Sequence, residues 1–146
     1  MIRHAVLAIL FALAVVSPAL AGEPQPHRVA IQVSENDPAR MNLALNNAIN
    51  IVKTYQGRKQ PVEVRIVTFG PGVTLVRADT SPLATRVKSF VDGVPEVSFD
   101  VCDNTLAALH KAEGKEIPSL DGVTHVEAGA VTLIDLQEQG WSYLRP

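Results

Sequence analysis

The chain has 146 residues, with 13 basic and 15 acidic side chains and a formal net charge of −2 at pH 7. The charges are dispersed, and no basic stripe or basic aromatic-rich segment is present, which excludes the usual patterns of nucleic-acid binding. A single cysteine excludes an internal disulfide, and the scattered histidines form no zinc-ligand pattern with it. We expect one small domain with no metal, no cofactor and no nucleic-acid partner.

The first 21 residues have the pattern of a secretory signal peptide. Arg3 supplies a positive charge, residues 5–16 form an unbroken apolar run, and residues 19–21 read Ala-Leu-Ala, a small-x-small cleavage site. The run is shorter than the roughly 20 residues that span a bilayer, which argues against the alternative of a membrane anchor. We predict cleavage after Ala21, a single α/β domain over residues 22–146, a periplasmic or secreted location, and no membrane attachment of the mature protein.

The mature chain begins with a strand and a helix. Apolar residues alternate over residues 27–34, which is typical of a strand. Asp37 can cap a helix, and Pro38 fits its first position. Apolar side chains then recur three and four residues apart as far as Tyr55, so we predict a helix over 38–55 that stops near Gly57.

The rest of the chain continues the alternation of strands and helices. Gly70-Pro71-Gly72 predicts a tight turn, and residues 73–78 form either a further strand or a helical turn. The other predicted elements are strands over 62–69, 96–101, 122–126 and 141–144, and helices over 81–93, 104–113 and 130–139. This order predicts a three-layer α/β domain with a five-stranded, mainly parallel sheet and helices on both faces.

Cys102 is the first candidate for chemistry. It lies at the carboxyl end of a predicted strand, where ligands and reactive groups gather in open α/β sheets. The N–H groups of the next helix favour the thiolate, whereas Asp100 and Asp103 oppose it. The residue is therefore a candidate nucleophile, sulfur acceptor or redox thiol. The alternative is a small buried apolar side chain.

Four neighbouring residues are candidates for binding. Asn104 and Thr105 either cap the following helix or hydrogen-bond an anion beside Cys102. Gly70 and Gly72 either only form a turn or also offer backbone N–H groups to an anion.

Two other features concern the remaining polar and aromatic residues. His110 lies about two helical turns beyond Cys102, or ~12 Å, which is too far for a general base, so we interpret it as a surface or interface residue. Trp141 and Tyr143 alternate in the last predicted strand and either pack on the core or face a second subunit, because a short edge strand invites covering. No catalytic triad, nucleophile elbow or dinucleotide fingerprint can be recognised, so nothing indicates a hydrolase or a cofactor-dependent oxidoreductase.

Taken in order, these motifs resemble the DsrE/DsrF-like proteins, which share the YchN-like fold. The resemblance spans residues 27–146. It rests on residues 34–37, on Asn42, Leu45, Asn46 and Asn47 of the first helix, on residues 69–72 and 101–106, and on the closing segment 129–146. It implies a homo-oligomer, commonly a trimer or hexamer, and in the better-known branches a sulfur relay in which a cysteine after a strand carries a persulfide. Cys102 matches that position, and export would place this chain in the stand-alone branch.

We therefore predict a periplasmic sulfur-carrier or sulfur-binding protein in which Cys102 accepts a persulfide from a donor protein or passes it to an acceptor protein. The predicted binding residues around it are Asn36, Gly70, Gly72, Asn104 and Thr105. The alternative is a non-enzymatic, homo-oligomeric binding module with a structural Cys102. Thiol reactivity in the folded protein distinguishes the two.

Overall fold

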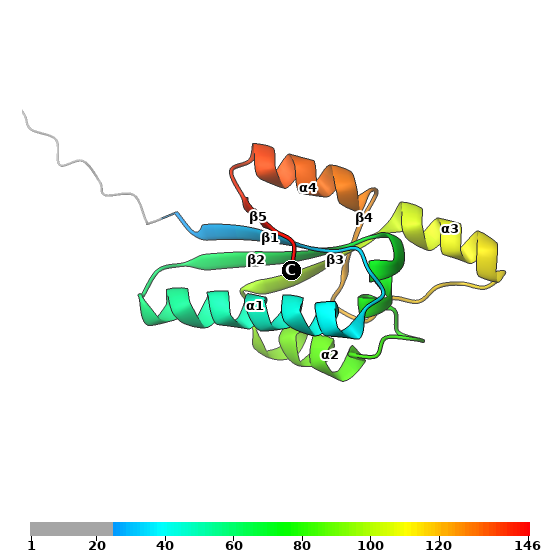
Figure 1. Ribbon diagram of the computed structural model, residues 1–146, viewed down its shortest axis with the longest axis horizontal. Coiled ribbons are helices and arrows are strands. Elements are labelled where there is room, and N and C mark those ends of the chain that lie inside the picture. Colours follow the sequence, from blue (N-terminus) through cyan, green and yellow to red (C-terminus); the bar gives the residue numbers. More distant parts are fainter. Residues whose placement is uncertain (1–24) are drawn as a thin grey trace, which may run out of the picture.

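The computed structural model describes residues 25–146 and shows a parallel sheet between helices (Figure 1). The strands are β1 (His27–Val33), β2 (Val62–Thr68), β3 (Val97–Cys102), β4 (Thr124–Val126) and β5 (Ser142–Leu144). Their order across the sheet is β4-β3-β2-β1-β5, and all four pairings are parallel. The predicted fold class is confirmed. The predicted signal peptide, residues 1–21, lies outside the described residues.

The helices lie on both faces of the sheet. They are α1 (Pro38–Gly57), α2 (Ala84–Gly93), α3 (Asp103–Glu113) and α4 (Gly129–Glu138), with a 3₁₀ helix, η1 (Gly70–Val76). Figure 1 shows α1 and α2 on one face, α4 on the other, and α3 projecting beyond the carboxyl ends of the strands. The chain steps across the sheet from β1 to β4 and then returns past β1 to β5. A right-handed return crossover must use the opposite face, which explains the position of α4.

The first helix begins where the sequence predicts. The Asp37 carboxylate accepts hydrogen bonds from the N–H groups of Ala39, at 2.8 Å, and Arg40, at 3.4 Å. Pro38 occupies the first turn, where its missing N–H leaves no intrahelical bond unmade. The predicted N-cap of α1 is confirmed.

Residues 70–76 form one 3₁₀ helix, so of the two alternatives for residues 73–78 the helical turn is right as far as Val76, while Arg77 makes only an isolated antiparallel bridge with Ser119. Gly70 has a φ of +52°, which glycine adopts without strain. A Cβ on Gly72 would lie only 2.2 Å from the Val33 carbonyl oxygen, so glycine allows η1 to pack directly on the end of β1. The short helix therefore belongs to the packing at the carboxyl edge of the sheet.

The two faces of the sheet bury cores of different size. Side chains alternate along each strand, so β1 directs Ile31 toward α1 and Ala30 toward α4. The larger core includes Leu45, Ile66 and Phe99, whereas the smaller one beneath α4 contains Ala30, Val67, Leu133, Leu136 and Trp141. Trp141 packs in the core, as one of the two alternatives predicted. Tyr143 is exposed, and its hydroxyl donates to Gln32 Oε1 at 2.6 Å.

Within residues 25–146, no helix is both long and apolar enough to cross a membrane.

Candidate functional site around Cys102

Cys102 lies where the N-termini of two helices meet. It is the last residue of β3 and the N-cap of α3. It pairs in register with Val126 of β4, and the chain then enters α4 at Gly129. The Thr105 hydroxyl and the backbone N–H groups of Gly129, Thr105 and Asn104 all act on the Cys102 sulfur. The two helices therefore present their positive ends to one thiol.

These donors control the ionisation of Cys102. Burial raises the pKa of the thiol, but the Thr105 hydroxyl and the three N–H groups outweigh burial and hold the pKa below its usual value. The two flanking carboxylates are engaged elsewhere, because Asp100 pairs with Arg65 at 2.6 Å and Asp103 contacts His125. Cys102 is only 5% exposed, so only a small part of this residue is accessible from the surface.

Thr105 is held in position by Gly70. The Gly70 N–H donates to Thr105 Oγ1 at 3.0 Å, which leaves the hydroxyl hydrogen free to point at the Cys102 sulfur. The hydrogen bonds therefore run from Gly70 through Thr105 to the thiol. Of the two alternatives predicted for Asn104 and Thr105, capping of α3 is wrong, because Cys102 occupies the N-cap and no side chain makes a cap bond. The third residue of the helix turns its hydroxyl to the sulfur instead.

Three of the five predicted binding residues line one groove between η1 and α3. Asn36, Gly70 and Thr105 border a hollow of about 570 Å³. Its walls are mainly apolar and include Val73, Leu109 and Ala112. Thr105 both lines this groove and contacts Cys102, so it joins the two features.

The other two predicted binding residues have different surroundings. Asn104 is exposed, and its N–H faces the Cys102 sulfur and also donates to the Glu127 carbonyl oxygen at 3.1 Å. Gly72 is buried against β1, and its N–H donates to the Phe69 carbonyl oxygen at 3.1 Å. Both glycines thus use their N–H groups inside the protein. Gly70 orients Thr105, and Gly72 allows close packing against β1.

His110 and His125 both lie away from the Cys102 sulfur. His125 pairs in register with Val101, the neighbour of Cys102 in β3. Because successive strand residues point to opposite faces, His125 and Cys102 lie on opposite faces of the sheet. His110 contacts the Lys115 carbonyl oxygen through Nδ1, at 2.8 Å, near the end of α3.

An ion-pair cluster closes one end of the groove, and no pattern in the sequence predicts it. Arg77 borders the groove, is 8% exposed, and contacts Asp79 at 2.9 Å and Glu113 at 2.7 Å. Its hydrogen bonds hold the pKa values of both carboxyl groups below their usual range. Lys115 also contacts Asp79, at 2.9 Å. Glu113 lies 36 residues from Arg77, so only the fold brings them together and fixes the end of α3.

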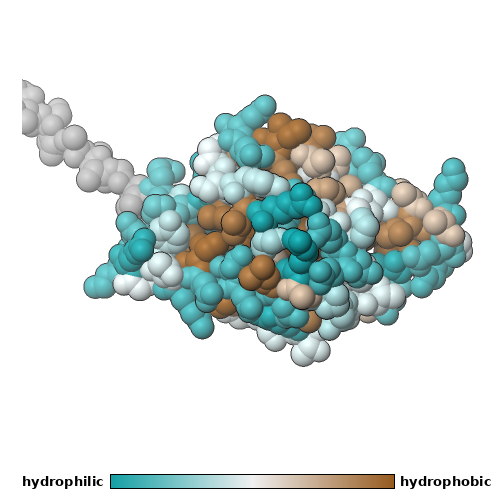
Figure 2. All heavy atoms as spheres, viewed as in Figure 1, coloured by the Kyte–Doolittle hydropathy of each residue, from teal (hydrophilic) through white to brown (hydrophobic). Residues whose placement is uncertain are grey.

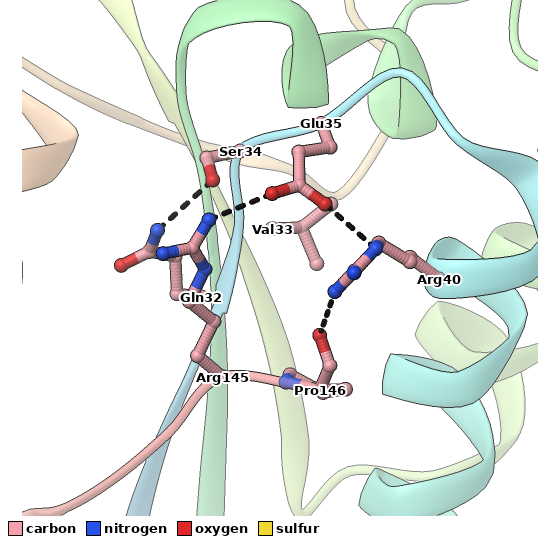
Figure 3. A pocket seen from close by; sticks show the side chains of 7 residues that line it. All are labelled: Gln32, Val33, Ser34, Glu35, Arg40, Arg145 and Pro146. Atoms are coloured by element: carbon pink, nitrogen blue, oxygen red, sulfur yellow. Dashed lines mark hydrogen bonds and ion pairs between the residues drawn. The ribbon is translucent and has the colours of Figure 1, made fainter.

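A second hollow lies at the point where the strand order reverses, between β1 and β5 (Figure 3). Such crevices commonly bind ligands in α/β sheets. Here the space is about 10 Å³, and Glu35 fills it by pairing with Arg40 at 2.9 Å and Arg145 at 2.7 Å. The Arg40 guanidinium also donates to the Pro146 carbonyl oxygen, at 3.0 Å. The crevice is therefore closed by its own side chains, and Cys102 with its groove is the better candidate.

Among residues 25–146, no three His, Cys, Asp or Glu side chains gather in a way that would hold a metal ion.

Comparison with known proteins supports the fold and adds nothing on activity. No family model and no curated protein matches the chain. The chain is similar to the solved structure of MTH1491, a protein of unknown function from Methanobacterium thermoautotrophicum. The two share 29% sequence identity and a TM-score of 0.70, over 82% of this chain and 99% of that one.

Proposed function

We propose that the protein is a sulfur carrier of the DsrE/DsrF-like kind in which Cys102 holds the sulfur as a persulfide. The observation that carries this proposal is the set of donors around Cys102, which comes from two helix N-termini and the Thr105 hydroxyl. These donors favour the Cys102 thiolate, which is the nucleophile that sulfur transfer needs.

The transfer is a thiol–disulfide type of exchange. The Cys102 thiolate attacks the outer sulfur of a donor persulfide and forms a new S–S bond. The donor's own S–S bond breaks, and the donor leaves as a thiolate. The outer sulfur keeps its proton, and no external oxidant or reductant is required. The reverse reaction with the thiolate of an acceptor protein releases the sulfur again.

Mass spectrometry of the intact protein tests the proposal. After incubation with inorganic polysulfide and removal of the excess, the folded protein should gain the mass of one sulfur atom, and Cys102→Ser should gain none. Thr105→Val keeps the side-chain shape but removes the hydroxyl, so it should slow loading. Thr74→Val provides a matched control, because Thr74 borders the same groove without acting on the thiol. Loading of Cys102 only after unfolding would contradict the proposal.

The second candidate is a homo-oligomeric binding module with a structural Cys102, and the 5% exposure of this residue favours it. A thiol that resists alkylation in the folded protein and takes up no sulfur would support this function over the first.

Both candidates include a homo-oligomer, a trimer or a hexamer, and the outer face of α4 supports one. Val131 and Ile134 on this helix are each 53% exposed, and Figure 2 shows hydrophobic surface over α4. Light scattering should give a mass of several subunits for the wild type and a smaller one for Ile134→Asp. Leu43→Asp, at an exposed apolar position on α1, should leave the mass unchanged. A single-subunit mass for the wild type would contradict oligomerisation.

We also propose that the protein is exported and cleaved after Ala21, which its apolar leader supports. N-terminal sequencing of the exported protein should begin at Gly22. Recovery of the uncleaved chain in membranes would contradict cleavage.

A further inference from the structure

Three side chains beside β4 form a hydrogen-bonded chain of serine, histidine and aspartate. Ser119 Oγ lies 2.9 Å from His125 Nε2, and His125 Nδ1 lies 2.5 Å from Asp103 Oδ1. Ser119 belongs to the loop after α3, His125 to β4, and Asp103 to the first turn of α3. Three separate segments therefore meet at the two nitrogens of one imidazole.

The order of the three groups sets the direction of proton transfer. A carboxylate only accepts hydrogen bonds, so Asp103 fixes the His125 proton on Nδ1. In the neutral imidazole Nε2 is then the acceptor, and the Ser119 hydroxyl donates to it. The distance between Ser119 Oγ and His125 Nε2 lies within the range in which a general base takes a proton. This is the arrangement of a nucleophile, its base and the group that orients the base.

The backbone holds Asp103 and Ser119, on either side of His125, in place. Asp103 lies in the first turn of α3, where a negative charge is favoured. Ser119 forms an antiparallel bridge with Arg77, flanked by hydrogen bonds from Ala78 to Pro118 and from Leu120 to Val76. In such a pair the flanking residues make the hydrogen bonds, so the Ser119 N–H points away from Arg77 and makes no hydrogen bond across the bridge.

The three hydrogen-bonded side chains are accessible to small molecules. The side chains of His125 and Asp103 are 48% and 52% exposed, and Ser119 is half-buried. Water therefore reaches Ser119, His125 and Asp103 and weakens the charge interactions among them. The same exposure leaves room for a substrate that needs no deep pocket. A small carboxylic ester with a good leaving group meets this condition.

We propose that Ser119, His125 and Asp103 form a second site, independent of Cys102, that transfers acyl groups from small carboxylic esters. Ser119 Oγ forms a bond to the ester carbonyl carbon while His125 Nε2 takes the hydroxyl proton. The bond from that carbon to the leaving oxygen breaks, and His125 returns the proton to the departing alcohol. Water then attacks the acyl-serine in the same way and releases the carboxylic acid, so the ester and water become acid and alcohol.

The test uses the full chain with Cys102→Ser, so that the thiol cannot be acylated. With 4-nitrophenyl acetate, the folded protein should release nitrophenolate and carry an acetyl group on Ser119 Oγ, as located by peptide mass spectrometry. A fluorophosphonate probe should label the same residue. Ser119→Ala should abolish both signals, whereas Ser98→Ala, at an exposed serine of β3, should change neither.

The supporting variants separate a catalytic role from a structural one. His125→Gln should slow acylation about 10²-fold. Asp103→Asn keeps the side-chain shape but loses the charge that fixes the tautomer, so it should slow acylation by at least about tenfold, whereas loss of the favourable helix-end charge should lower the melting temperature by only a few degrees. Labelling of Ser119 at the same rate in Asp103→Asn or in the unfolded chain would overturn the proposal. So would acetate found on other residues only.

Discussion

Gly72→Ala tests whether this glycine serves packing or ligand binding. The added Cβ would lie 2.2 Å from the Val33 carbonyl oxygen, 2.5 Å from the Val33 carbonyl carbon and 2.7 Å from the Ser34 nitrogen. Ordinary contacts begin near 3.4 Å, so η1 and β1 must separate by about 1 Å. All three atoms belong to the backbone, and no side-chain rotation can relieve the overlap.

Overpacking of a rigid core costs about 1–3 kcal/mol, and a clash with strand backbone belongs at the upper end of that range. We therefore expect Gly72→Ala to lower the free energy of unfolding by about 3 kcal/mol and the melting temperature by about 10 °C. Gly57→Ala is the matched control, because nothing lies within 4 Å of its Cβ at the end of α1. Removing a helical glycine there should stabilise the protein by at most about 0.5 kcal/mol.

Thermal unfolding by circular dichroism measures both variants. A Gly72→Ala protein that melts with the wild type would refute the close packing of η1 on β1. If that stable variant also failed to take up sulfur from polysulfide, Gly72 would instead be a binding residue.

Three other substitutions probe the site and its supports. Because the pKa of Cys102 is lowered in the folded protein, the wild type should gain stability over Cys102→Ser as pH rises from that pKa to the usual thiol value, and should show no such gain at lower pH. Urea unfolding of both proteins at several pH values measures this gain. A difference in unfolding free energy that is the same at every pH would contradict the prediction. Arg77→Met should lower the free energy of unfolding at neutral pH, and by progressively less as pH falls through the lowered pKa values of Asp79 and Glu113. A loss of stability that does not depend on pH would rule out the ion pairs as its cause. Asp37→Ala should cost about 1 kcal/mol while Asp37→Asn costs little, and equal losses would show that the N-cap bonds to α1 are unimportant.

Local patterns in the sequence were sufficient to predict the layered architecture of the fold. Val62–Thr68 shows the alternation of apolar and charged residues that marks a strand, and the Asp37-Pro38 pair marks a helix start by its chemistry alone. The sequence contained less information about residues 70–76, because a glycine needed for close packing looks the same as a glycine needed for a turn. The wrong cap prediction for α3 has a similar origin, since Thr105 finds its partner Gly70 35 residues away.

The candidate sites could be predicted only where one residue marked them. Cys102 was found because it is a lone thiol at a strand end, but its donor from α4, the Gly129 N–H, depends on the pairing of β3 with β4. Asp103 and His125 are 22 residues apart, and no spacing rule connects them with Ser119. Such a chain of contacts exists only after β4 has been placed beside β3.

The junction between β3 and α3 explains how two chemistries arise so close together. Cys102 and Asp103 are adjacent, and the change from strand to helix occurs between them. Cys102 ends the strand on the α4 side and receives the N–H groups of both helices, whereas Asp103 contacts His125, which β4 places on the opposite face. The sheet itself therefore separates the thiolate from the imidazole. Removing the sulfur with Cys102→Ser should leave acylation of Ser119 unchanged, and removing the imidazole with His125→Gln should leave sulfur loading unchanged. Loss of both activities in either variant would mean that the two groups act as one site.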